Sequence, residues 1–90
     1  MANHKSALKR IRQSEKRQKR NQHIRSGVRS EIRHFRQAVE AGDASQAGER
    51  FARAERAIRR ATSKGVIPKR RADRSVSRLA VRLNAVRASS

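Results

Sequence analysis

The chain has 90 residues and no cysteine, and its 25 Lys plus Arg against 7 Asp plus Glu give a formal net charge of +18. This length suits one small domain, and the missing cysteine excludes disulfide bonds and thiolate metal sites. So large a charge opposes the compact state and favours a polyanionic partner. We therefore expect a thin-cored cytoplasmic domain with neither a membrane span nor a signal peptide.

A long first helix is predicted over residues 6–41. Between Ile11 and Ile24 this segment has no Val, Ile, Leu, Met or Phe, so its first half is expected to project beyond the packed part of the molecule. Gly42 is predicted to end the helix, because glycine reaches the left-handed conformation without steric cost. Only the second half of the helix has an apolar face, formed by Ile24, Val28, Ile32, Phe35 and Val39.

A second helix is predicted over residues 44–64, with Asp43 as its N-cap, Gln46 completing a capping box and Gly65 at its end. A third is predicted over residues 69–87. Their apolar rows are Ala47, Phe51, Ala54, Ile58 and Ala61, then Ala72, Val76, Leu79, Leu83 and Val86. No stretch alternates as a strand does. The predicted fold class is therefore all-α, a three-helix bundle with a long, projecting basic first helix, in a single domain over residues 1–90.

Catalytic and metal motifs are not found in the sequence. His4, His23 and His34 lie far apart with no cysteine near them, and the carboxylates lie mostly three or four residues from an arginine, as in helix ion pairs. There is no P-loop or other Gly-rich phosphate cradle. We therefore expect no enzyme activity, cofactor, metal or small-molecule substrate.

The first half of the long helix is the main candidate binding surface. Like charges one turn apart destabilise a free helix, so a basic helix without packing needs an external partner, and nucleic-acid phosphates supply one. With no Trp or Tyr in the chain, recognition is expected to depend on phosphate placement and RNA shape rather than on base stacking. One ridge is formed by Lys5, Lys9, Arg12, Lys16 and Lys19, with Arg10, Arg17 and Arg20 beside it.

The third helix has a second basic row, in which Arg74, Arg78 and Arg82 step by four residues. An architectural DNA-binding protein of the nucleoid type would share this charge and is the alternative, although no wedge or groove-reading element is marked. A membrane-surface helix would need an apolar face, and a coiled coil would need sustained heptads. RNA binding is therefore favoured.

Two strings of the sequence, MANHKSALKRIRQSEKRQKRN and ATSKGVIPKRRADRSVSRLAVRLN, resemble those of bacterial small-subunit ribosomal protein twenty, the S-twenty family. The resemblance covers essentially the whole chain. It implies a three-helix bundle that binds small-subunit (16S) ribosomal RNA in the cytoplasm, helps nucleate assembly, and ties the 5′ domain of that RNA to its 3′ minor domain. Other small-subunit components are compatible partners.

Physical pattern and resemblance together give one set of candidate RNA-binding residues. The chain departs from the family at Pro68, Lys69 and Arg70, where His and Lys-Asn are frequent, which affects the start of the third helix. Val81 replaces a frequent Lys and is not expected to contact RNA. The candidates are Asn3, His4, Lys5, Ser6, Lys9, Arg10, Arg12, Gln13, Lys16, Arg17, Lys19, Arg20, Asn21, Lys64, Lys69, Arg70, Arg71, Arg74, Ser77, Arg78 and Arg82.

Overall fold

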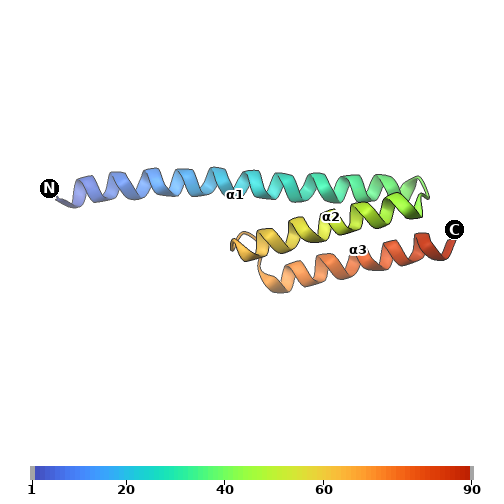
Figure 1. Ribbon diagram of the computed structural model, residues 1–90. Helices are drawn as coiled ribbons and strands as arrows, with labels where there is room; N and C mark the ends of the chain where they lie inside the picture. The colour runs from blue at the N-terminus through green and yellow to red at the C-terminus, as the bar shows by residue number, and fades with distance from the viewer. Residues whose placement is uncertain (1, 90) are drawn as a thin grey trace.

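The computed structural model describes residues 2–89, and the side chains of residues 4–89. Three helices follow one another along the chain: α1 (Ala2–Glu40), α2 (Ala44–Ser63) and α3 (Lys69–Ser89). Residues 2–89 contain no strand, and α2 lies between α1 and α3 (Figure 1). The prediction of an all-α fold with three helices and a long first one is therefore confirmed.

The helix boundaries differ from the expected ones mainly at the two outer ends. α1 begins at Ala2 rather than near Ser6, because the four residues before Ser6 include no glycine or proline to stop a helix. α3 continues to Ser89, two residues past the expected end. The inner ends, at Glu40, Ser63 and Lys69, agree with the expected ones to within one residue.

Both helix–helix connections begin with a C-cap built on a glycine. Gly42 and Gly65 have φ of 71° and 77°, the left-handed region that favours glycine. After α1, the Asp43 N–H donates to the Ala38 carbonyl at 3.2 Å. After α2, the Val66 N–H donates to the Ala61 carbonyl at 2.9 Å, and the Val66 side chain is buried in the core. Both glycines were predicted to end a helix in the left-handed conformation, and this is confirmed. The hydrogen bonds make both ends Schellman motifs, which turn the chain back on itself.

The starts of α2 and α3 are built differently from each other. The Asp43 side chain accepts a hydrogen bond of 3.1 Å from the Gln46 N–H, so the predicted N-cap is confirmed. The Asp43 N–H already donates to a carbonyl at the end of α1. It is therefore not available to the Gln46 side chain, which was expected to complete a capping box. At α3, the Pro68 carbonyl accepts from the Ala72 N–H at 3.0 Å. Pro68 thus stands immediately before the helix and does not delay its start.

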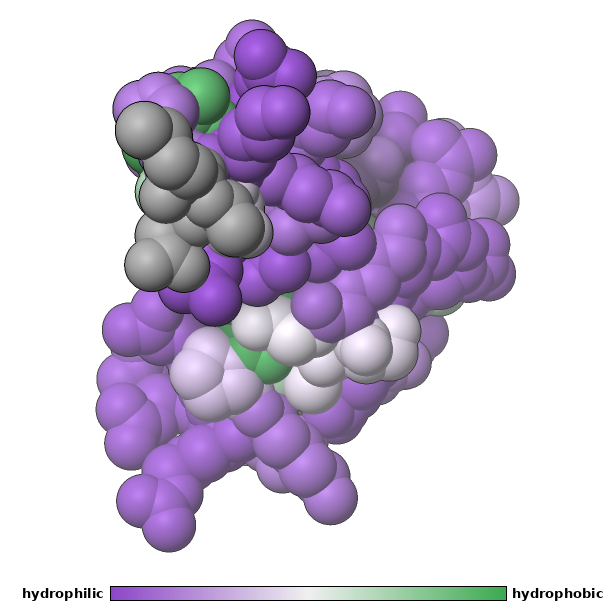
Figure 2. Space-filling model, turned by 90° about the vertical axis from the view of Figure 1, so that its left-hand side faces the viewer, coloured by the Kyte–Doolittle hydropathy of each residue, from purple (hydrophilic) through white to green (hydrophobic). Residues whose placement is uncertain are grey.

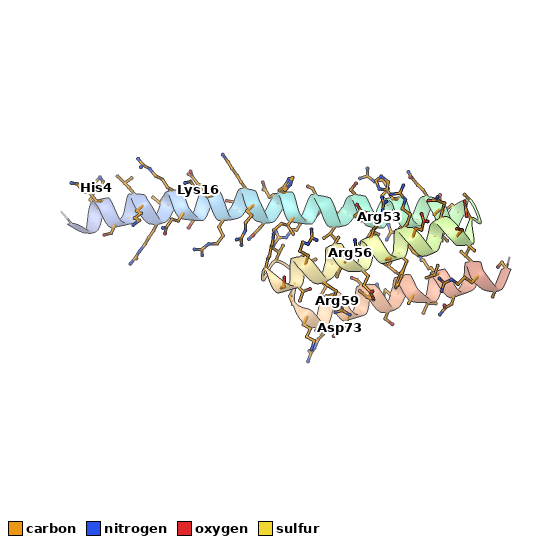
Figure 3. All side chains as sticks on the ribbon, viewed as in Figure 1. His4, Lys16, Arg53, Arg56, Arg59 and Asp73 are labelled. Carbon is orange, nitrogen blue, oxygen red and sulfur yellow. The ribbon has the colours of Figure 1, made fainter. Side chains whose placement is uncertain are left out.

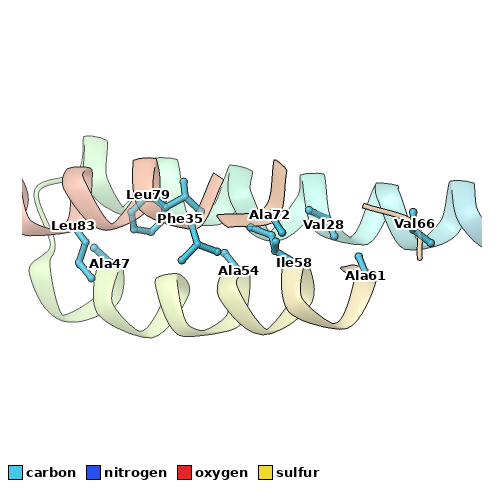
Figure 4. Close-up of a cluster of buried hydrophobic side chains, with 11 residues drawn as sticks. Val28, Phe35, Ala47, Ala54, Ile58, Ala61, Val66, Ala72, Leu79 and Leu83 are labelled. Carbon is cyan, nitrogen blue, oxygen red and sulfur yellow. The ribbon is translucent and has the colours of Figure 1, made fainter. Parts of the chain in front are cut away.

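The hydrophobic core lies between the second half of α1 and the two shorter helices (Figure 4). Phe35 and Ile58 are its largest fully buried side chains. The Phe35 ring meets that of Phe51 with centroids 6.1 Å apart, a tilted arrangement that is favourable for two aromatic rings. Three α2 residues, Ala47, Ala54 and Ala61, are fully buried and let the neighbouring helices approach closely. The predicted apolar rows of α2 and α3 therefore do form the core.

The first half of α1 takes no part in this core. Every residue from 4 to 20 is exposed, and Ile24 is the first side chain of α1 that packs against the core. We call residues 2–22 the basic arm. At 1.5 Å per residue the arm is roughly 30 Å long, and it extends beyond the paired helices at the N-terminal end of the molecule (Figure 1). The molecule is accordingly elongated, with extents of 68 × 21 × 13 Å.

Candidate nucleic-acid interface

The basic arm presents cations on all sides of one helix. Residues 4–20 contain eight Lys or Arg side chains and a single carboxylate, that of Glu15. All of these side chains are exposed, and they extend from α1 in several directions (Figure 3). Seen from the N-terminal end, the surface is mostly hydrophilic (Figure 2). The arm is therefore suited to a polyanion that contacts several of its sides.

The arm candidates differ in how accessible they are. The eight cations are exposed, as are the polar candidates His4, Ser6 and Gln13. Asn21 is half-buried, and its Oδ1 atom is buried without a hydrogen-bond partner in the part of the chain that the structure describes. Asn3 lies in α1, but its side chain is outside the described residues. Two apolar side chains, Leu8 and Ile11, are 44% and 54% exposed among these cations.

A second basic surface follows the outside of α3. Arg71, Arg74, Arg78 and Arg82 are all exposed, and their spacing of three or four residues places them on one face of the helix. Ser77 is exposed beside this row. Of the remaining candidates, Lys64 is exposed in the connection between α2 and α3, and Lys69 and Arg70 are exposed in the first turn of α3. Val81 is 66% exposed within the same surface.

The two basic surfaces meet at one end of the bundle. The α2–α3 connection lies at the end from which the arm projects (Figure 1). There Lys64 lines a hollow together with His23 and Gly27 of α1. At the opposite end Arg82 lines a hollow with Val39 and Gly42. The α3 row therefore runs from the base of the arm to the far end of the bundle.

Further cations, which the candidate set does not include, lie on α2. Arg53, Arg56 and Arg60 are exposed and share one helix face with Lys64, at steps of three, four and four residues. The spacing that identified the α1 and α3 rows is present here too. Acidic residues lie near these arginines in the sequence, a pattern typical of an ordinary solvated helix face. Only the packing shows which of them are paired, as Arg59 is with Asp73 at 2.6 Å.

The described residues form neither a metal site nor a membrane-spanning helix. Among the side chains of residues 4–89, no group of three or more His, Asp or Glu could hold a metal ion. Within residues 2–89, no helix is both long and apolar enough to cross a membrane. The basic arm and the α3 row, by contrast, have a clear chemical preference, which is for phosphate.

Comparison with known proteins agrees with this chemistry. Residues 2–84 match the model of a family described as "Ribosomal protein S20". The chain is 56% identical over 84 residues to the small ribosomal subunit protein bS20 of Geotalea daltonii, covering 93% of this chain and 97% of that protein. Identity to the same-named protein of Nocardia farcinica is 49%, covering 93% of this chain and 98% of the relative. The chain therefore belongs to the ribosomal protein S20 family.

Proposed function

We propose that this protein is a structural component of the small ribosomal subunit in the cytoplasm and that it binds 16S ribosomal RNA directly. Residues 1–90 act as a single RNA-binding domain without catalytic activity. The observation that carries the proposal is the basic arm, a helix of about six turns with cations on all sides, of which residues 4–20 are exposed and lie outside the core. Membership of a ribosomal protein family supports the same role.

Binding to RNA stabilises the arm for an electrostatic reason. Its ridge places Lys5, Lys9, Arg12 and Lys16 at steps of four, three and four residues, where neighbouring like charges repel. Each phosphate contact relieves that repulsion and releases counterions from the RNA, which favours binding further. Because cations also cover the other sides, the arm suits a space between several RNA strands. It can neutralise phosphates that RNA folding brings close together.

The two basic surfaces provide a way to tie RNA segments together. The arm extends roughly 30 Å beyond the bundle, while the α3 row follows the bundle itself. One RNA segment can therefore surround the arm while another lies along α3. By resemblance to the family, we assign these segments to the 5′ domain and the 3′ minor domain of the 16S RNA, which the protein would hold together during assembly.

The cations and the polar residues have different tasks in this proposal. Arginines such as Arg74 and Arg78 donate two parallel hydrogen bonds to one phosphate, whereas lysines such as Lys5 and Lys9 act as mobile point charges. Exposed polar side chains, among them Ser6, Gln13 and Ser77, hydrogen-bond to phosphate or sugar oxygens and fix the position of the protein on the RNA. We propose the whole set of candidates named above as RNA-binding residues.

Competition binding tests the proposed function. Labelled 16S ribosomal RNA is titrated with the protein at near-physiological salt, in the presence of excess duplex DNA or an unrelated folded RNA. We expect the ribosomal RNA to remain bound against both competitors, with an affinity that falls steeply as salt is raised. If duplex DNA competes as well as the ribosomal RNA, the protein is better described as an architectural DNA-binding protein.

A further inference from the structure

A groove between α1 and α2 combines unpaired cations with one carboxylate. One hollow of about 270 Å³ is lined by Glu31 of α1 and by Arg53, Arg56 and Arg60 of α2. It adjoins a hollow of about 340 Å³, since Glu31 and Arg60 line both. The second hollow extends towards Lys64 at the base of the arm. None of these α1 and α2 side chains except Lys64 belongs to the RNA surfaces proposed above.

The three arginines of the groove are available for a ligand. Their side chains are exposed, and their guanidinium groups have no hydrogen-bond or ion-pair partner among residues 4–89. Arg59 on the same helix differs, because it is paired with Asp73 of α3 (Figure 3). The groove therefore offers several N–H donors along one face of α2, an arrangement suited to phosphate oxygens.

Glu31, in contrast to the arginines, requires a hydrogen-bond donor. Its Oε2 atom is buried and accepts no hydrogen bond from any residue that the structure describes. A buried acceptor without a donor is unfavourable, and a carboxylate is more so than a neutral group. Because this oxygen is closed to solvent, a ligand reaches it only when the Glu31 side chain turns towards the hollow that it lines. Such a ligand offers a hydrogen-bond donor to Glu31 as well as anionic oxygens to the arginines.

An RNA strand offers both groups at once. Its phosphates are acceptors for arginine, and its 2′-hydroxyl is a donor that DNA lacks. We propose that this groove, formed by Glu31, Arg53, Arg56 and Arg60, is a third RNA-binding site, in which the arginines bind phosphates and Glu31 accepts a hydrogen bond from a 2′-hydroxyl. The proposal rests on the RNA-binding function proposed above and adds to it a means of distinguishing RNA from DNA.

The arginine part is tested by comparing two variants of equal charge. One replaces Arg53, Arg56 and Arg60 with glutamine, and the control replaces Arg29, Arg33 and Arg36, which are equally exposed on α1. Glutamine retains good helix propensity, and circular dichroism checks the fold. We expect the groove variant to bind 16S ribosomal RNA at least ~10-fold more weakly than the control, with a salt slope lower by about three. Equal losses in both variants would mean that only net charge matters and would overturn the site.

The Glu31 part is tested with Glu31→Leu and a short hairpin prepared both as RNA and as DNA of the same sequence. Loss of one negative charge should raise affinity for both hairpins alike. Loss of the hydroxyl contact should additionally lower the ratio of RNA affinity to DNA affinity, by about tenfold. An unchanged ratio would refute the role of Glu31. The competition experiment with 16S ribosomal RNA and duplex DNA is run alongside on the unaltered protein. If that experiment succeeds while the ratio stays unchanged, the role of the groove fails and the proposed function stands.

Discussion

Replacing Lys5, Lys9, Arg12 and Lys16 together with glutamine should weaken binding to 16S ribosomal RNA at least ~100-fold at near-physiological salt. The salt slope should fall by about four, one unit for each lost phosphate contact. All four side chains are exposed and lie outside the hydrophobic core, so the bundle should remain folded. Titrations at several salt concentrations measure affinity and slope together.

A control variant that loses the same number of positive charges tests whether this effect is specific to the arm. Replacing Arg25, Arg29, Arg33 and Arg36 with glutamine removes four exposed cations from the other half of the same helix. We expect this variant to lose much less affinity than the arm variant. If the arm variant binds the RNA as tightly as the unaltered protein, the arm is not the main binding element and the proposed mechanism is wrong.

The largest effect on stability is expected for Phe35→Ala. Phe35 is 0% exposed and contacts Phe51 across the interface between α1 and α2. Its removal should cost about 3–5 kcal/mol, the usual range for a buried phenylalanine. Small domains have only about 5–15 kcal/mol in total, and repulsion at a net charge of +18 reduces what is available here. The free variant should therefore be largely unfolded by circular dichroism in low urea.

Ile11→Ala is the matched control for this prediction. Ile11 is 54% exposed in the arm, so its replacement should change the free energy of unfolding by less than about 0.5 kcal/mol. Saturating RNA should partly restore the fold of the Phe35 variant, because a ligand that binds only the folded state stabilises it. Equal stability of the two variants would show that the core is not where the structure places it.

The fold was predictable because local signals agree with one another. Left-handed glycines at Gly42 and Gly65 and the N-cap at Asp43 occur where the apolar rows stop and start. The apolar row of α3, from Ala72 to Val86, is buried at every position. The absence of an apolar face between Ile11 and Ile24 likewise predicted a segment outside the core, and residues 4–20 are indeed exposed.

The groove between α1 and α2 was not predictable in the same way. Spacing places Arg53, Arg56 and Arg60 on one face of α2, but only the rotation and approach of the helices decide that Glu31 of α1 faces them. Pairing is also decided by packing, as the contact between Arg59 and Asp73 across fourteen residues shows. The capping box failed for a related reason, since the Asp43 N–H was already used by the preceding helix.

In the proposed mechanism, the arm is the main RNA-binding element and the bundle supports it. Amide hydrogen exchange with and without 16S ribosomal RNA tests this most directly, because it reports each segment separately. We expect the protection of residues 4–20 to rise strongly on binding, while the amides around Phe35 and Ile58 are protected in both states. Protection that appears on α2 and α3 alone, with the arm unchanged, would contradict it.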